Sequence, residues 1–197
     1  MVSILSFLIA IIVHECAHGL VAYWLGDDTA RLEGRLTLDP RAHIDLIGTI
    51  LLPLVLVISH SPVVFGWAKP IPVNARNFID PKKGLFLTGA AGPAANMLLA
   101  AFSAILLRSR LIPMPFISYI LVSIVLINLI VGVFNLIPIP PLDGSRILVG
   151  LLPNTMARLY IRLEPYGFIV LLTFLYLGLL DRAIFPLVAF LSKALLI

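Results

Sequence analysis

The sequence predicts an all-α polytopic membrane protein, with residues 1–197 forming a single domain. Of its 197 residues, 60% are hydrophobic and 12% are charged, whereas a soluble domain has about 25% charged residues. The mean hydropathy of +1.08 agrees with a chain that lies mostly in lipid. The apolar residues also gather into stretches of helix length that short polar segments separate.

We predict five to six hydrophobic segments from these stretches. They cover residues 1–25, 46–66, 85–107, 116–138, 164–180 and, more briefly, 183–197. Each of the first five approaches the length of about 20 residues that a spanning helix needs. The first stretch begins at the initiator Met without a basic region or a clear cleavage site, so we expect it to be retained rather than removed as a signal peptide.

Two polar segments connect the first three stretches. Residues 26–45 contain the sequence LEGRLTL at 32–38, in which apolar and polar residues alternate. This alternation predicts a short strand, a membrane-associated β element in an otherwise helical protein. Residues 67–84 are rich in Pro, Asn and cations and are predicted to be a loop.

The first apolar stretch contains the motif H-E-x-x-H at His14-Glu15-Cys16-Ala17-His18. Positions i and i+4 share a helix face, so the two histidines can bind one Zn²⁺ while Glu15 reaches its water as a general base. An ionised group inside a span costs about 2.5 to 3.5 kcal/mol, which makes such residues functional candidates. The alternative is a buried His–Glu pair that stabilises a helix bundle. Cys16 points away from the histidine face and is expected to pack.

A second polar cluster, NLIPIPPLDG at residues 135–144, follows the 116–138 stretch. Three prolines in four positions, at 138, 140 and 141, must unwind the helix. Asp143 would then be a carboxylate beside irregular backbone, suited to be a third zinc ligand, because two histidines and a carboxylate are a common catalytic set. The alternative is that Asp143 caps the N-terminus of the helix SRILVGLL.

A third cluster, GAAGPAAN at residues 89–96, lies inside the 85–107 stretch. Its small residues allow close helix approach, and the amide of Asn96 needs a hydrogen-bond partner. This cluster is either a packing seam or a direct part of a catalytic site. Asn128 is open to the same two interpretations.

The motifs HECAH, AGPAAN and NLIPIPPLDG, in this order, resemble the site-2 protease family of intramembrane zinc metalloproteases, in a compact prokaryotic form without PDZ or CBS domains. The resemblance implies a catalytic core over residues 1–150 and accessory helices over 151–197. It implies that one zinc ion is held by the ligands His14, His18 and Asp143. It also implies that Glu15 activates water and that Asn135 and Asn96 bind the substrate backbone or support the oxyanion.

Zinc binding by these ligands would constrain the topology, because they must lie at one membrane depth. His18 and Asp143 both lie toward the C-terminal ends of their segments, so the first and fourth apolar stretches should run parallel. Parallel helices need an odd number of spans between them, yet the sequence offers two. We therefore predict that residues 46–66, broken by Gly48 and Pro53, form a re-entrant segment.

The distribution of cations agrees with that topology. Three cations lie on one side, at Arg108, Arg110 and Arg182, and Lys193 lies in a C-terminal tail that is assigned to neither side. Ten lie on the other: Arg31, Arg35, Arg41, Lys69, Arg76, Lys82, Lys83, Arg146, Arg158 and Arg162. The larger group marks the cytoplasmic side by the positive-inside rule. We expect a multi-pass protein of a prokaryotic cell membrane, with its N-terminus outside and its zinc site nearer the cytoplasmic face.

The expected partners are the lipid bilayer and protein substrates with transmembrane segments, cleaved in regulated proteolysis or in clearing signal-peptide remnants. The net charge of +4 is spread among loops rather than gathered on one face, so no nucleic-acid partner is expected. A metal-binding membrane transporter is the main alternative, but His43 and His60 have no carboxylate at ligand spacing. The intact Glu15 argues against a non-catalytic scaffold. The sequence does not specify an oligomeric state.

Overall fold

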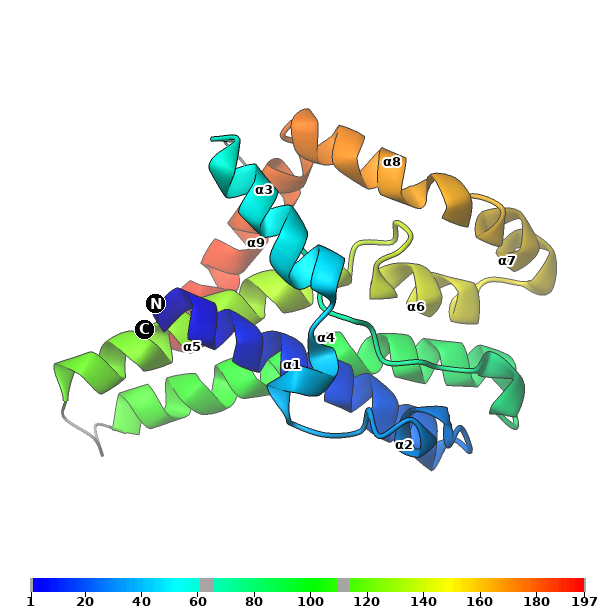
Figure 1. Ribbon diagram of the computed structural model, residues 1–197, viewed down its shortest axis with the longest axis horizontal. Helices are drawn as coiled ribbons and strands as arrows, with labels where there is room; N and C mark the ends of the chain where they lie inside the picture. The colour runs from blue at the N-terminus through cyan, green and yellow to red at the C-terminus, as the bar shows by residue number, and fades with distance from the viewer. Residues whose placement is uncertain (1, 61–65, 110–113, 197) are drawn as a thin grey trace.

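This computed structural model describes residues 2–60, 66–109 and 114–196, and the regular elements within these ranges are all helices (Figure 1). The α-helices are α1 (Val2–Trp24), α2 (Thr29–Leu32), α3 (Leu52–Ile58), α4 (Pro81–Ser109), α5 (Pro115–Asn135), α6 (Asp143–Leu151), α7 (Asn154–Ile161), α8 (Glu164–Tyr176) and α9 (Leu179–Leu196). The short 3₁₀ helices are η1 (Pro40–His43) and η3 (Ala75–Asn77), and the π-helix is η2 (Leu46–Leu51).

Three helices, α1, α4 and α5, are long and apolar enough to cross a membrane. The successive helices α7 and α8 would add a fourth crossing if they form one span, although they meet at a bend of 67°. Helix α8 alone has 13 residues, which is about 20 Å of helix against an apolar layer of about 30 Å. The membrane-protein class is thus confirmed, whereas the predicted count of five to six segments is not.

Helices α1 and α5 run in the same direction, whereas α4, which lies between them in the sequence, runs antiparallel to both (Figure 1). This is the parallel arrangement that a shared metal site requires of the two ligand-bearing regions. The apolar helix Leu46–Ile58 is shorter than a spanning helix, and the re-entrant path of residues 46–66 stays a prediction. Of that prediction, residues 61–65 lie outside the described residues.

The predicted strand at residues 32–38 is not found, since Leu32 ends α2 and the following residues form turns and bends. A strand needs a partner with which to exchange backbone hydrogen bonds. Here the nearby backbone carbonyls of Lys69 and Pro70 accept hydrogen bonds from the side chain of Arg35 instead. The alternation of apolar and polar residues at 32–38 therefore does not correspond to a strand, and that prediction is wrong.

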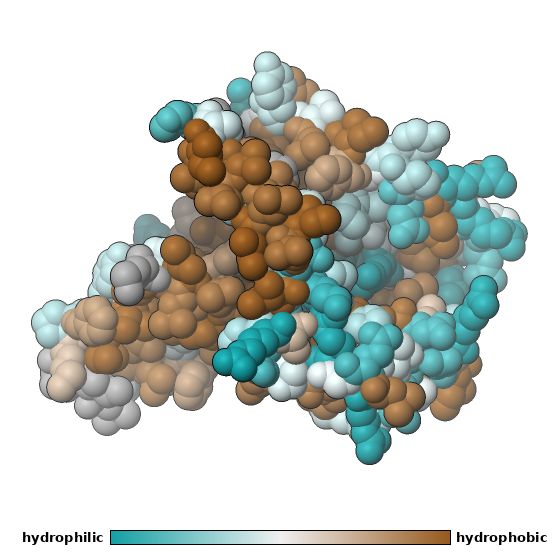
Figure 2. Space-filling view, in the orientation of Figure 1, coloured by the Kyte–Doolittle hydropathy of each residue, from teal (hydrophilic) through white to brown (hydrophobic). Residues whose placement is uncertain are grey.

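The buried apolar core lies where α4, α5 and α9 meet. It consists of Ala100, Ala104, Val125, Leu129, Val133, Leu180, Ile184 and Val188. Many large apolar side chains elsewhere are exposed, and Figure 2 shows them gathered over α3 and the neighbouring part of the molecule, with hydrophilic side chains toward the opposite end. Such a surface suits contact with lipid over most of the molecule and with water at one end.

An extended segment, residues 66–74, leads toward α4, and we call it the strap. Among the hydrogen bonds of its backbone, Trp67 N–H donates to the Gly48 carbonyl (3.1 Å), Lys69 N–H to the His43 carbonyl (2.9 Å), and Asn74 N–H to the Asp27 carboxylate (2.7 Å). The strap is therefore held at one end by Gly48 of η2 and at the other by Asp27, which follows α1.

We expect Asp27→Ala to loosen this tie. Burial raises the pKa of Asp27, but hydrogen bonds from Thr29, Asn74 and Asn77 outweigh that effect and hold the pKa below its ordinary value. Leaving these donors without an acceptor should cost about 2 to 4 kcal/mol of unfolding free energy. Because the folded pKa is depressed, the stabilisation is complete above pH 3.8 and is lost as the pH falls through the folded value.

Thermal unfolding in detergent micelles between pH 3 and pH 7 measures this contribution. Asp28→Ala is the matched control, because Asp28 is exposed and lies 3.8 Å from Arg31 in a surface ion pair. Equal stability of the two variants at pH 7 would contradict the role of Asp27.

Candidate metal centre

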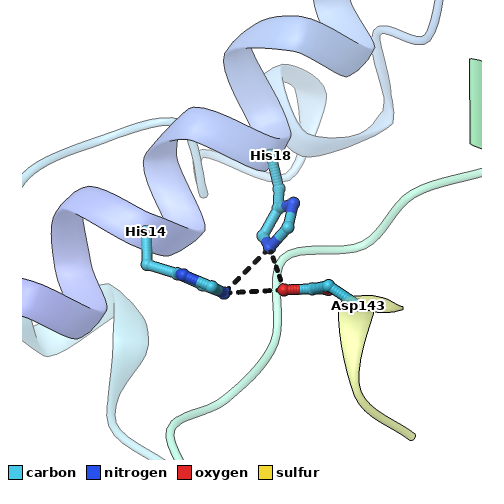
Figure 3. A group of neighbouring side chains, drawn as sticks. All are labelled: His14, His18 and Asp143. Atoms are coloured by element: carbon cyan, nitrogen blue, oxygen red, sulfur yellow. Dashed lines mark hydrogen bonds and ion pairs between the residues drawn. The ribbon is translucent and has the colours of Figure 1, made fainter. Parts of the chain in front are cut away.

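Helix α1 presents His14 and His18 on one face, and Asp143 at the start of α6 points toward both (Figure 3). The Oδ2 atom of Asp143 lies 2.9 Å from Nε2 of His14 and 3.1 Å from Nε2 of His18. The two Nε2 atoms are 3.0 Å apart. All three side chains are buried, so the sequence-predicted ligands meet in one enclosed cluster.

Hydrogen bonds on the far side of each ring fix the histidine tautomers. Nδ1 of His18 lies 2.6 Å from the carbonyl oxygen of Thr88, which can only accept, so this nitrogen carries a proton. Nδ1 of His14 lies 2.6 Å from Oδ1 of Asn96 and donates to it. In its neutral form, each ring would therefore turn an Nε2 lone pair toward the other ring and toward a carboxylate. Three electron-rich atoms at such distances repel one another unless a cation lies among them, so this donor set fits a zinc ion.

Asn96 belongs to a buried chain of amides that holds His14 in place. Its Nδ2 donates to the Ala10 carbonyl (3.0 Å) and to Oδ1 of Asn128 (2.8 Å). Asn128 in turn donates to the Ile124 carbonyl (2.9 Å). Both asparagine side chains are fully buried. The structure thus places Asn96 behind His14, with no surface of its own toward a substrate.

Helix α4 approaches the histidines closely because residue 92 is a glycine. A Cβ atom at Gly92 would lie 2.4 Å from Nε2 of His18 and 2.6 Å from Cε1 of His14. The cluster of small residues therefore does more than pack helices. It leaves room at the ligand atoms themselves.

The irregular backbone predicted around the three prolines delivers Asp143. Helix α5 ends at Asn135, and residues 136–142 form turns and bends before α6 begins. The alternative that Asp143 caps the following helix is wrong. Asp143 is the first residue of α6, Leu142 holds the cap position, and no side-chain capping bond is made there. Its carboxylate is free to face the histidines.

Glu15 lies beside the ligands and opens on a cavity of about 470 Å³. Its Oε2 accepts a hydrogen bond from the Ile71 N–H of the strap (2.8 Å). Asn135 lines the same cavity, although its Nδ2 donates to the Val131 carbonyl (3.0 Å). The predicted base and one predicted substrate-binding residue therefore share a space that a peptide could enter.

Two contributors were not assigned a role from the sequence. Asn128 was left between packing and function, and its signal was an amide within an apolar stretch. The Ile71 N–H had no signal except its position between two prolines. Backbone groups and second-layer amides are hard to assign because their roles depend on what lies opposite them.

An H-E-x-x-H helix and a carboxylate from a distant segment, among helices suited to lipid, define the class of membrane-embedded zinc metalloproteases. A family model described as peptidase family M50 matches residues 112–177. The chain is 38% identical over 191 residues to "Putative zinc metalloprotease YwhC" of Bacillus subtilis, an alignment that covers 93% of this chain and 84% of that protein.

More distant relatives carry a similar name. "Putative zinc metalloprotease Rip2" of Mycolicibacterium smegmatis is 27% identical over 186 residues, covering 94% of this chain and 70% of that protein. No solved structure matches the chain. The chain belongs to peptidase family M50, the site-2 protease family, and is a hydrolase of the zinc metalloprotease class.

Gly92→Ala should expel the metal. The added methyl group would occupy the space beside both Nε2 atoms, so we expect the zinc content of the purified protein to fall from near one per chain toward zero. Metal analysis of detergent-solubilised protein measures it, with Ala94→Ser on the exposed side of the same helix as the control. Full zinc occupancy in Gly92→Ala would refute this geometry.

Asn96→Ala should weaken zinc binding about 10- to 100-fold, the usual effect of removing a partner that orients a ligand. Competition with a chelator measures the affinity. Asn135→Ala is the matched comparison, because Asn135 lines the cavity and donates a hydrogen bond to the Val131 carbonyl of its own helix. A role of Asn96 in substrate contact alone would leave zinc affinity unchanged in both variants.

Proposed function

We propose that this protein is an intramembrane zinc metalloendopeptidase that hydrolyses peptide bonds in or near transmembrane segments of other membrane proteins. The single observation that carries this proposal is the position of Glu15. It lies beside three metal-ligating side chains, on a helix fit to span a membrane, and faces an apolar cavity. The physiological role would be regulated intramembrane proteolysis or the clearance of signal-peptide remnants.

Zinc held by His14, His18 and Asp143 would supply a Lewis acid that polarises the scissile carbonyl and lowers the pKa of water to about 7. Glu15 takes a proton from the attacking water as the water oxygen bonds to the carbonyl carbon. It then passes that proton to the amide nitrogen as the C–N bond breaks. The products are a carboxylate and an amine.

The cavity beside Glu15 suits a transmembrane segment. Apolar side chains line most of it, among them Phe7, Ile11, Phe134 and Leu171. Asn135 offers the substrate backbone a polar contact there. A helical substrate hides its carbonyls in its own hydrogen bonds, so it must unwind before attack, and helix-breaking residues in the substrate should favour cleavage.

The proposed location is a prokaryotic cell membrane, with the site nearer the cytoplasmic face. Arg76 lies in η3, which directly follows the strap, and Lys82 lies in the first turn of α4, whereas Arg108 lies at the other end of that helix. Figure 2 shows hydrophilic side chains gathered at one end of the molecule, and the positive-inside rule would make a cation-rich end the cytoplasmic one. The proposed partners are substrate segments within the bilayer.

Transport of metal is less favoured. A transit path would need successive ligand groups, and one group able to hold a metal occurs within the described ranges.

Glu15→Gln should keep zinc but abolish cleavage, because the amide still fits the site but cannot take a proton. His14→Ala should lose both. The assay uses purified enzyme in proteoliposomes and a Leu/Ala transmembrane peptide with a central Asn-Pro pair between a fluorophore and a quencher. Full activity of Glu15→Gln would disprove the assigned base, and zinc flux without cleavage in the unmodified protein would favour a transporter.

A further inference from the structure

One peptide group of the strap lies between a buried arginine and Glu15. The Pro70 carbonyl accepts a hydrogen bond from Nη2 of Arg35 (3.3 Å), and the Ile71 N–H of the same peptide unit donates to Oε2 of Glu15 (2.8 Å). The Lys69 carbonyl accepts a second bond from Arg35 Nη2 (2.9 Å). A cation and a carboxylate are therefore linked through a single amide.

Arg35 is unusual because it is buried without a direct counterion. Its exposed fraction is 6%, and no carboxylate in the described part of the chain forms an ion pair with it. Its Nε atom has no hydrogen-bond partner. Burying an unpaired guanidinium is costly. Its Nη2 atom donates to two carbonyls of the strap, and through the strap Arg35 is linked to the carboxylate of Glu15.

The sequence around Ile71 leaves one donor for Glu15. Pro70 and Pro72 have no N–H, so Ile71 carries the only backbone donor of this tripeptide. The Ile71 side chain is buried against Gly19, one helical turn after Glu15, where an added Cβ would lie 3.1 Å from Ile71 Cδ1. Side chain and backbone together fix the strap against α1.

We propose that Arg35, acting through the Pro70–Ile71 peptide group, positions Glu15 for catalysis. A carbonyl that accepts from a cation polarises its own amide, which makes the N–H a stronger donor to the carboxylate. The Glu15 side chain is thereby held in one orientation beside the metal ligands. Arg35 is a positioning residue that touches neither metal nor substrate, and the proposal rests on the proposed role of Glu15 as the base.

Kinetics in the proteoliposome assay test this role. Arg35→Met should lower kcat about 10- to 100-fold, with KM and zinc content unchanged, as expected for loss of an outer orienting contact. Arg35→Lys keeps the charge and should recover much of the rate. The control is Arg41→Met, since Arg41 is an exposed arginine of the same polar segment. An unchanged kcat in Arg35→Met, or a loss that Lys does not rescue, would overturn the proposal.

A second pair of variants isolates the backbone donor. Ile71→Val keeps the N–H and most of the packing, whereas Ile71→Pro removes the N–H within an already proline-rich extended segment. We expect Ile71→Pro to resemble Arg35→Met and Ile71→Val to resemble the unmodified enzyme. If Arg35→Met loses its zinc because it misfolds, this pair still tests whether the hydrogen bond from Ile71 to Glu15 is needed for catalysis.

Hydrogen exchange gives a readout that needs no cleavage. Because residues 70–72 contain one exchangeable amide, deuterium uptake there reports on Ile71 alone. Glu15→Ala and Arg35→Met should each speed this exchange about tenfold or more, and Arg41→Met should not. Unchanged protection of Ile71 in both would overturn the proposal. If the unmodified enzyme cleaves no peptide, the proposed function fails, while the exchange result still decides whether Arg35 holds Glu15.

Discussion

The structure depends on bringing three electron-rich atoms together in a buried place. Two imidazole nitrogens and a carboxylate oxygen lie about 3 Å from one another, an arrangement that a bound metal cation would stabilise. The histidines come from α1 and the carboxylate from the start of α6, more than a hundred residues later. This requirement sets the parallel course of α1 and α5, the break after α5 and the close approach of α4.

Helix α4 contributes no ligand, yet it shapes the metal centre most. Gly92 leaves space at the ligand atoms, while Thr88 and Asn96 accept the outer hydrogen bonds of the two histidines. Between helices in lipid, close packing and buried polar contacts supply much of the association energy. The same residues of α4 therefore hold the helices together and orient the ligands.

Irregular backbone surrounds the site on two sides. Residues 136–142 lead into Asp143, and the strap runs past Glu15. Non-helical backbone among apolar helices is stable when protein groups satisfy its donors and acceptors. Asp27, Arg35 and Glu15 do this for the strap. The hydrogen bonds that stabilise the strap thus also fix the proposed catalytic base.

The sequence by itself determined the helical class, the pairing of His14 with His18 and the location of Asp143 beyond a proline break. These features depend on helix period and on local backbone geometry, which short stretches of sequence encode. Only the tertiary structure decided that Asn96 lies behind His14, that residues 32–38 form no strand, and that Ile71 meets Glu15. Such contacts join residues far apart in the chain, and their partners are fixed by how the helices pack.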